Sequence, residues 1–144
     1  MTATTAEQHD AIEQLLRLGD NALVHGQRLS EWCGHGPALE EDIALSNISL
    51  DCVGQARLLL ALAGTREAQG RDEDALAYLR DESAFRNYTL LELPNGHGPH
   101  DDYAITVARG FLHAALQAHL WPALATCTDR ELAAIAARSI NEAR

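Results

Sequence analysis

The 144-residue sequence has no lysine, only three cysteines and four prolines, and few aromatic residues (5%). Strands favour aromatic and β-branched residues, so their scarcity argues against an all-β fold. Alanine and leucine are abundant instead, with 25 and 22 copies, and both are strong helix formers. With 47% hydrophobic residues the chain has enough apolar surface to bury a core rather than remain disordered. The composition therefore predicts an all-α protein.

Every one of the eleven basic residues is an arginine, and 21 acidic residues bring the net charge to −10. A domain this acidic repels nucleic acids and anionic membranes, so neither is an expected partner. The cysteines lie far apart and form no Cys-x-x-Cys pair, which argues against a disulfide framework or a zinc site. Without a basic start followed by an apolar run, or an uncharged stretch of membrane-spanning length, the sequence predicts a cytoplasmic protein.

Helical periodicity predicts long helices joined by shorter ones. Apolar or small residues recur every three or four positions from about 6 to 33, and Gly19 and Gly26 in this stripe indicate close approach of another backbone. A second helix, apolar on nearly every side and therefore central, is predicted from Pro37 to about 68. Further helices are expected over 73–80, 82–91, about 101 to Pro122, and after Thr128. The spacing of a capping box occurs at Thr4 with Glu7 and at Thr128 with Glu131.

Three polar residues interrupt the apolar middle of the second predicted helix. Asn47, Asp51 and Gln55 stand at i, i+4 and i+8, and therefore on one line of one face. A buried carboxylate is costly unless it is paired or hydrogen-bonded, so Asp51 is expected to be buried and paired. The favoured interpretation is a structural network, with Arg57 or Arg28 as the partner. A degenerate metal site or a polar contact with a partner protein is a second interpretation, and a catalytic acid a third.

Long antiparallel helices invite a test for a ferritin-like di-metal site, which needs Glu-x-x-His on two of its helices. None of the seven histidines has an acidic residue three positions earlier, and three residues after Asp51 stands Gly54. The sequence therefore predicts no metal, cofactor or catalytic residue in this chain. A weaker cation candidate, at His97, His100, Asp101 and Asp102, is interpreted as a Gly/Pro-rich loop in which Asp101 caps the next helix. His113 and His119 are interpreted as surface or core-edge histidines rather than ligands. The aromatic residues Trp32, Trp121 and Phe111 are interpreted as core or interface anchors.

Several long strings resemble the C subunit of the ring-1,2-phenylacetyl-CoA epoxidases, a ferritin-like family of phenylacetic acid catabolism. They occur in order from about residue 14 to the end of the chain, at 18–37, 39–51, 54–57, 71–74, 85–87 and 94–96. Ser49 and Cys52 depart from the family pattern, in which these positions are usually apolar, and both are small enough to be tolerated.

The resemblance implies a ferritin-like antiparallel bundle of long helices, formed as one domain over residues 1–144 that corresponds to the N-terminal part of a longer family domain. It implies a non-catalytic structural subunit of a di-iron monooxygenase that epoxidises the ring of phenylacetyl-CoA. The expected partner is a catalytic ferritin-like oxygenase subunit that holds the di-iron centre, and self-association is a second possibility. The alternatives are a self-sufficient di-iron enzyme and a stand-alone helical interaction module.

The last predicted helix continues to Arg144 without a Gly, Pro or Asn stop signal. The chain is therefore expected to be truncated within that helix, and the bundle to be incomplete at its C-terminal end. Leu132, Ile135 and Ile140 should cover part of the groove between the helices. The upper ends of the first two helices should then lack a cover, which predicts self-association, binding of a partner helix or marginal stability.

Overall fold

The computed structural model describes residues 5–96 and 102–142. In chain order the elements are α1 (Thr5–Ser30), α2 (Leu39–Glu67), α3 (Glu73–Tyr78), the single 3-10 turn η1 (Glu82–Ala84), α4 (Thr89–Glu92), α5 (Tyr103–Leu124) and α6 (Arg130–Glu142). No strand occurs among these residues, so the predicted all-α class is confirmed.

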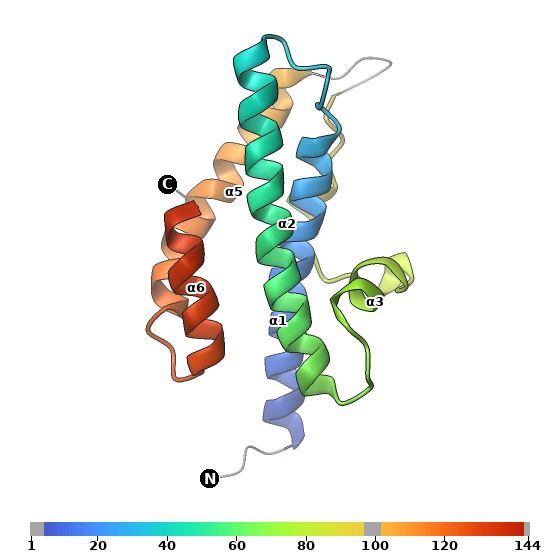
Figure 1. Ribbon diagram of the computed structural model, residues 1–144, viewed down its shortest axis with the longest axis vertical. Helices are drawn as coiled ribbons and strands as arrows, with labels where there is room; N and C mark the ends of the chain where they lie inside the picture. The colour runs from blue at the N-terminus through green and yellow to red at the C-terminus, as the bar shows by residue number, and fades with distance from the viewer. Residues whose placement is uncertain (1–4, 97–101, 143–144) are drawn as a thin grey trace.

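The long helices form an antiparallel bundle (Figure 1). α1 and α2 lie side by side in opposite directions, and α6 packs against both α2 and α5. α5 starts beside the upper end of α2 and leans away from it, whereas α3 lies on the opposite side of α2 from α5 and α6 (Figure 1). The segment containing α4 packs against α1. The bundle is therefore closed around α1 and more open between α2 and α5.

The main core lies along the contact between α1 and α2, and residues of α3, α5 and α6 extend it. Its most deeply buried members include Leu15, Ala22, Leu59, Ala63, Leu76, Trp121 and Ala136. Leu132, Ile135 and Ile140 of α6 join this cluster, as expected from the sequence.

Gly26 lies where α1 is in close contact with α2. A Cβ added to Gly26 would stand 3.1 Å from the Cβ of Cys52 and 3.2 Å from the carbonyl oxygen of Ser49. The Ser49 hydroxyl donates a 2.8 Å hydrogen bond to the carbonyl oxygen of Gly26. The close approach predicted for Gly26 is confirmed, and Ser49 is tolerated in the core because its hydroxyl has this partner. At Gly19 a Cβ would instead meet the side chain of Leu60, at 2.8 Å.

Several predicted boundaries were wrong by a few residues. α2 begins at Leu39 after an N-cap at Ala38, so Pro37 precedes the helix rather than opening it. The first helix ends at Ser30 and residues 31–35 form turns. Asp129, not Thr128, caps α6, because its Oδ1 accepts a 3.2 Å hydrogen bond from the amide of Leu132. Thr4, the other predicted cap, lies outside the described residues.

By length and composition α2 could cross a membrane, but half of its most apolar stretch is buried inside the fold. The core helix of a globular protein meets the same criteria. The central position predicted for this helix is therefore confirmed for its second half, where most buried residues lie. It was wrong for the first half, which exposes Leu39, Ile43 and Leu50.

Candidate functional site

A groove of about 460 Å³ lies between α2 and α5, with α1 beneath it and the end of α6 at one end. Its lining comes from all four helices: His25, Leu29, Ala44, Leu45, Ile48, Asp51, Cys52, Gln55, Tyr103, Thr106, Val107, Gly110, Phe111, His113, Ala114, Gln117 and Glu142. Most of these side chains are apolar, and a few polar groups converge beneath them. This combination is typical of binding sites in proteins.

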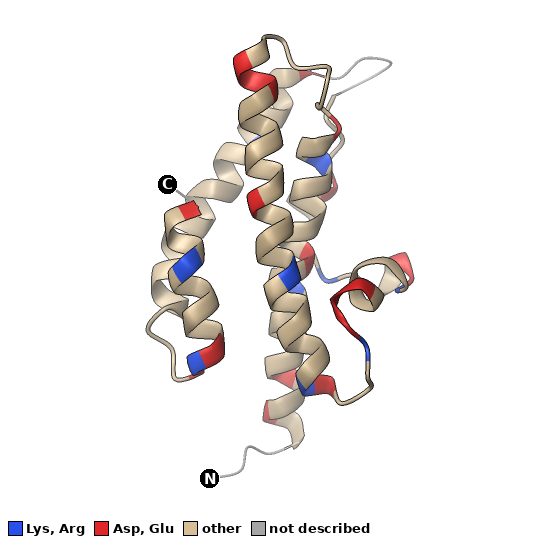
Figure 2. Ribbon diagram, in the orientation of Figure 1, with Lys and Arg blue, Asp and Glu red and all other residues tan. Residues whose placement is uncertain are grey.

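The walls of the groove expose large apolar side chains. Ile48 of α2 is 46% exposed, and Val107 and Phe111 of α5 are 47% and 70% exposed. Charged residues are rare along both walls, as Figure 2 shows by the long uncharged stretches of α2 and α5. Among the described residues the upper end of α2 is uncovered, as predicted, but the upper part of α1 is largely buried, so the prediction was wrong for α1. Exposed apolar surface of this kind marks interaction sites.

Two histidines form the floor of the groove. His25 of α1 and His113 of α5 have ring centroids 4.6 Å apart, with the ring planes inclined by 58°. Both side chains are more than nine-tenths buried. Burial lowers the pKa of His25 to about 3, with smaller contributions from His113 and Arg109, and lowers the pKa of His113 to about 4. Both imidazoles are therefore neutral at pH 7, each with one donor and one acceptor nitrogen.

The polar atoms of this floor are not satisfied by the described residues. Nδ1 of His25 and both ring nitrogens of His113 are buried without a hydrogen-bond partner. Gln55 donates from Nε2 to Oε2 of Glu142 at 3.0 Å, but its Oε1 is also buried and unpartnered. Buried polar groups are usually paired, so this concentration of orphan atoms in one groove needs an explanation.

The lining of the groove does not suit a reactive or metal-binding centre. Burial, together with Asp51 and Glu142, raises the pKa of the Cys52 thiol to about 12, so the thiol stays protonated and is a poor nucleophile. In the part of the chain that the structure describes, no three His, Cys, Asp or Glu residues are grouped so as to hold a metal ion. The donor set does not fit a di-iron centre, because the two imidazoles pack on each other without a shared carboxylate.

The predicted polar line on α2 is only partly buried. Gln55 is buried, as expected, but Asn47 and Asp51 are exposed, so the expectation of a buried and paired Asp51 was wrong. The three residues share one face of α2, and only the Gln55 end of that face is covered, where α6 ends. The proposed arginine partners bind elsewhere: Arg57 pairs with Glu73, and Arg28 pairs with Glu31.

The buried carboxylate of this protein is Asp20, which was not among the residues predicted from the sequence. Asp20 and Arg80 form an ion pair with side-chain exposures of 0% and 4%. The carboxylate of Asp20 also accepts a 2.8 Å hydrogen bond from the backbone amide of Arg86. A signal was present in the sequence, because Asp20 falls inside the apolar stripe of α1 between Gly19 and Ala22.

Hydrogen bonds of two buried residues, Arg109 and Asn95, connect α5, the loop before it and the end of α1. Arg109 donates to the carbonyl oxygen of Leu93 at 2.6 Å and to Oδ1 of Asn95 at 2.5 Å. The hydroxyl of Thr106 donates to the same Asn95 oxygen at 3.1 Å and accepts a 2.9 Å bond from the indole of Trp32. These bonds hold α5 beside α1 and so position His113 over His25.

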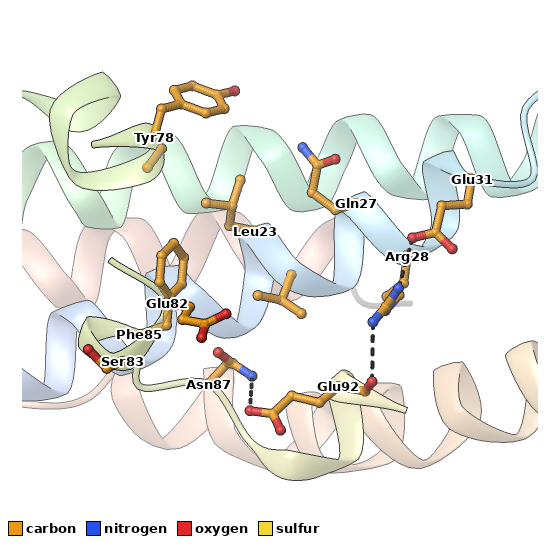
Figure 3. A pocket seen from close by; sticks show the side chains of 12 residues that line it. Leu23, Gln27, Arg28, Glu31, Tyr78, Glu82, Ser83, Phe85, Asn87 and Glu92 are labelled. Carbon is orange, nitrogen blue, oxygen red and sulfur yellow. Dashed lines mark hydrogen bonds and ion pairs between the residues drawn. The ribbon is translucent and has the colours of Figure 1, made fainter. Parts of the chain in front are cut away.

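A second pocket, of about 780 Å³, lies on the other side of α1, against α3, η1 and α4 (Figure 3). Polar residues at its edge bind one another: Arg28 donates to Oε1 of Glu31 at 3.0 Å and to the carbonyl oxygen of Glu92 at 3.2 Å. Asn87 donates to Oε1 of Glu92, also at 3.2 Å. Because these groups already have partners, the groove over the histidine pair is the stronger candidate.

Most of the second cation candidate lies in a part of the chain that the structure does not describe. His97, His100 and Asp101 lie outside the described residues. Asp102 is the N-cap of α5, in the role predicted for Asp101, and its Oδ1 accepts a 2.9 Å hydrogen bond from the amide of Ala104.

Comparison with known proteins identifies relatives of this chain. A family model described as "Phenylacetic acid catabolic protein" matches residues 1–144. The C subunit of the 1,2-phenylacetyl-CoA epoxidase of Escherichia coli (strain K12) is 50% identical over 129 residues, which are 90% of this chain and 50% of that protein. The chain therefore spans about half the length of this curated relative.

Proposed function

The chain belongs to the phenylacetic acid catabolic protein family, and on this basis we propose that it is a non-catalytic structural subunit of a phenylacetyl-CoA epoxidase. Its role is to support a catalytic ferritin-like subunit that holds the di-iron centre and epoxidises the aromatic ring. The name of the E. coli relative, a lettered subunit of an epoxidase, supports membership in a complex of several chains. We expect such a catabolic complex to be cytoplasmic.

The apolar surface of α2 and α5 is the observation that carries the proposal. Besides the groove walls, large apolar side chains are exposed at Leu39, Ile43, Leu50 and Val53 on α2 and at Leu112 and Leu116 on α5. Isolated exposed apolar residues are common, but a concentration on two neighbouring helices is typical of a surface that another protein covers. The missing Glu-x-x-His pairs agree with a supporting role.

Sedimentation velocity of the chain with the catalytic oxygenase subunit tests this proposal. We expect a complex that sediments faster than either protein, and no stoichiometric iron in the chain alone by elemental analysis. Iron at two atoms per isolated chain would favour a self-sufficient di-iron enzyme. Separate sedimentation of the two proteins would favour a stand-alone interaction module. Either result overturns the proposed function.

A further inference from the structure

The two halves of α5 are attached to the rest of the fold by different kinds of side chain. In the first half, residues 103–113, the buried side chains are Thr106, Arg109 and His113, which are spaced by three and four residues as on one face of a helix. All three are polar. In the second half Trp121 is buried in the main apolar core. An apolar core therefore holds one end of α5, whereas polar contacts hold the other end against α1.

The polar contacts of the first half differ in how they respond to acid. The hydroxyl of Thr106 accepts a 2.9 Å hydrogen bond from the indole of Trp32, and neither group titrates near neutral pH. The ring of His113 packs on that of His25, with the centroids 4.6 Å apart. Since histidine ordinarily titrates near pH 6.5, the histidine pair is the one of these contacts that mild acid can change.

The surroundings of the histidine pair disfavour a positive charge on either ring. Nδ1 of His25 and both ring nitrogens of His113 are buried without a hydrogen-bond partner among the described residues. Burial, followed by the charges of His113 and Arg109, lowers the pKa of His25 to about 3, and burial lowers the pKa of His113 to about 4. Two protonated rings would place like charges in contact, beside the buried cation of Arg109.

Carboxylates of the neighbouring helices do not compensate such a charge. Asp51 of α2 and Glu142 of α6 line the groove above the pair, but Asp51 is exposed and Glu142 already accepts hydrogen bonds from other side chains. At the end of α1 the carboxylate of Glu31 pairs with Arg28. The thiol of Cys52 on α2 is protonated and neutral at pH 7. Among the described residues, neither imidazole therefore has an anionic partner.

We propose that the first half of α5 is an acid-sensitive hinged segment, which stays on α1 while His25 and His113 are both neutral and moves away from α1 when acid protonates either ring. The opening exposes both rings to water, where each can hold its proton without the cost of burial. The second half of α5 stays in place, because Trp121 remains in the main core. This inference goes beyond the proposed function, since it concerns the chain without a partner.

Native-state hydrogen exchange of the free chain tests the inference, because the amides of residues 106–113 exchange when the segment opens. The opening constant is the observed exchange rate divided by the rate of an unfolded peptide of the same sequence at the same pH. Protonation of each imidazole should raise this constant about 25-fold between pH 7 and pH 5, and both together about 600-fold. Low urea concentrations should not change it, because a local opening exposes little surface.

Variants of three histidines identify the groups that trigger the opening. His25→Phe and His113→Phe each keep an aromatic ring at the contact and remove one titrating group, so each should reduce the pH effect to about 25-fold. His119→Phe is the matched control, because His119 is an exposed residue of the same helix. It should retain the full effect. If one of the two buried variants does not fold, the other carries the same expectation.

Two results would overturn the inference. If the pH effect on residues 106–113 is the same in the parent chain and in the variants at positions 25 and 113, the histidines are not the trigger. If residues 106–113 exchange at the same rate as residues 59–63 of α2 at every urea concentration, α5 opens only when the whole chain unfolds. A urea-independent opening of 106–113 that increases in acid and requires both histidines supports the inference.

Discussion

Buried polar residues on the two sides of α1 differ in whether they have hydrogen-bond partners. Asp20 and His25 are five residues apart, which places them about 140° apart around the helix, and both are nearly inaccessible to water. Asp20 is paired by Arg80 and by the amide of Arg86, both from the segment that follows α3. On the other side, Nδ1 of His25 and the nitrogens of His113 have no partner among the described residues. Among the described residues, the carboxylate on the Asp20 side is therefore paired, whereas the imidazole nitrogens on the groove side are not.

The difference follows from what covers each side. The segment from 80 to 95 runs over the Asp20 side of α1 and brings backbone amides and arginines to it; the amide of Tyr88, for example, donates to Oδ1 of Asn21 at 2.7 Å. The groove side faces α5 instead. Among the described residues, the indole of Trp32 bonds to Thr106 and packs on Tyr103, and the ring of His25 packs on that of His113. The buried polar groups are therefore paired on the side that the segment 80–95 covers, whereas on the groove side several lack a hydrogen-bond partner among the described residues.

Removing the charge of Asp20 should give the largest loss of stability. Asp20→Asn leaves Arg80 as a buried cation without a counter-charge, so the free energy of unfolding should fall by about 3–5 kcal/mol. Urea denaturation followed by circular dichroism measures this. A loss below about 1 kcal/mol would show that water or another acceptor replaces the carboxylate, and the contrast between the two sides of α1 would disappear.

Acid should destabilise the groove side through its histidines. Their pKa values in the fold, about 3 and about 4, lie below the 6.5 of an unfolded histidine. The unfolded state therefore binds more protons between pH 6.5 and pH 4, and stability falls as the pH falls through that window. At pH 5 each imidazole should lower the free energy of unfolding by about 2 kcal/mol relative to pH 7.

Urea denaturation of the His113→Leu variant at pH 7 and pH 5 checks the origin of this pH dependence. Replacing one of the two buried bases should remove roughly half of the difference between the two pH values. The carboxyl of Asp129 also has a lowered pKa, because Arg66 binds it, but it titrates below its ordinary value of 3.8 and so outside this window. An unchanged pH dependence in His113→Leu would mean that His113 is not buried in its neutral form.

Loosening the bonds between α1 and α5 should have an intermediate effect. Thr106→Val keeps the shape of the side chain but leaves the buried indole N–H of Trp32 without an acceptor, at a cost of about 1–3 kcal/mol. Thr106→Ser retains the hydroxyl and serves as the control. If both variants unfold at the same urea concentration, the hydroxyl does not contribute and only packing holds α5 in place.

Asp51 should show the smallest effect, although the sequence suggested the opposite. Asp51→Asn changes the charge of an exposed side chain, so the free energy of unfolding should change by no more than about 0.5 kcal/mol. This variant is also the matched control for Asp20→Asn, because the same substitution is made in the same long antiparallel helix pair. A loss of more than about 1 kcal/mol would mean that the Asp51 side chain is buried in the folded chain.

Composition and periodicity were sufficient to establish the all-α class and the extent of the long helices to within a few residues. Alanine and leucine content and the 3.6-residue period are local properties, so they need no knowledge of the packing. The strings that identify the family are likewise read directly from the residues. Gly26 was also informative, because a glycine in a helical stripe indicates a close neighbour whatever that neighbour is.

Which aspartate is buried, in contrast, depends on how the helices pack. Asp20 and Asp51 both stand in the apolar stretches of long helices, between Leu18 and Ala22 in one case and between Leu50 and Cys52 in the other. Periodicity shows which residues share a face, but it does not show which face another segment covers. The segment after α3 folds back over Asp20, while nothing among the described residues covers Asp51. That choice rests on contacts between residues some sixty positions apart, such as Asp20 with Arg80, which no local pattern contains.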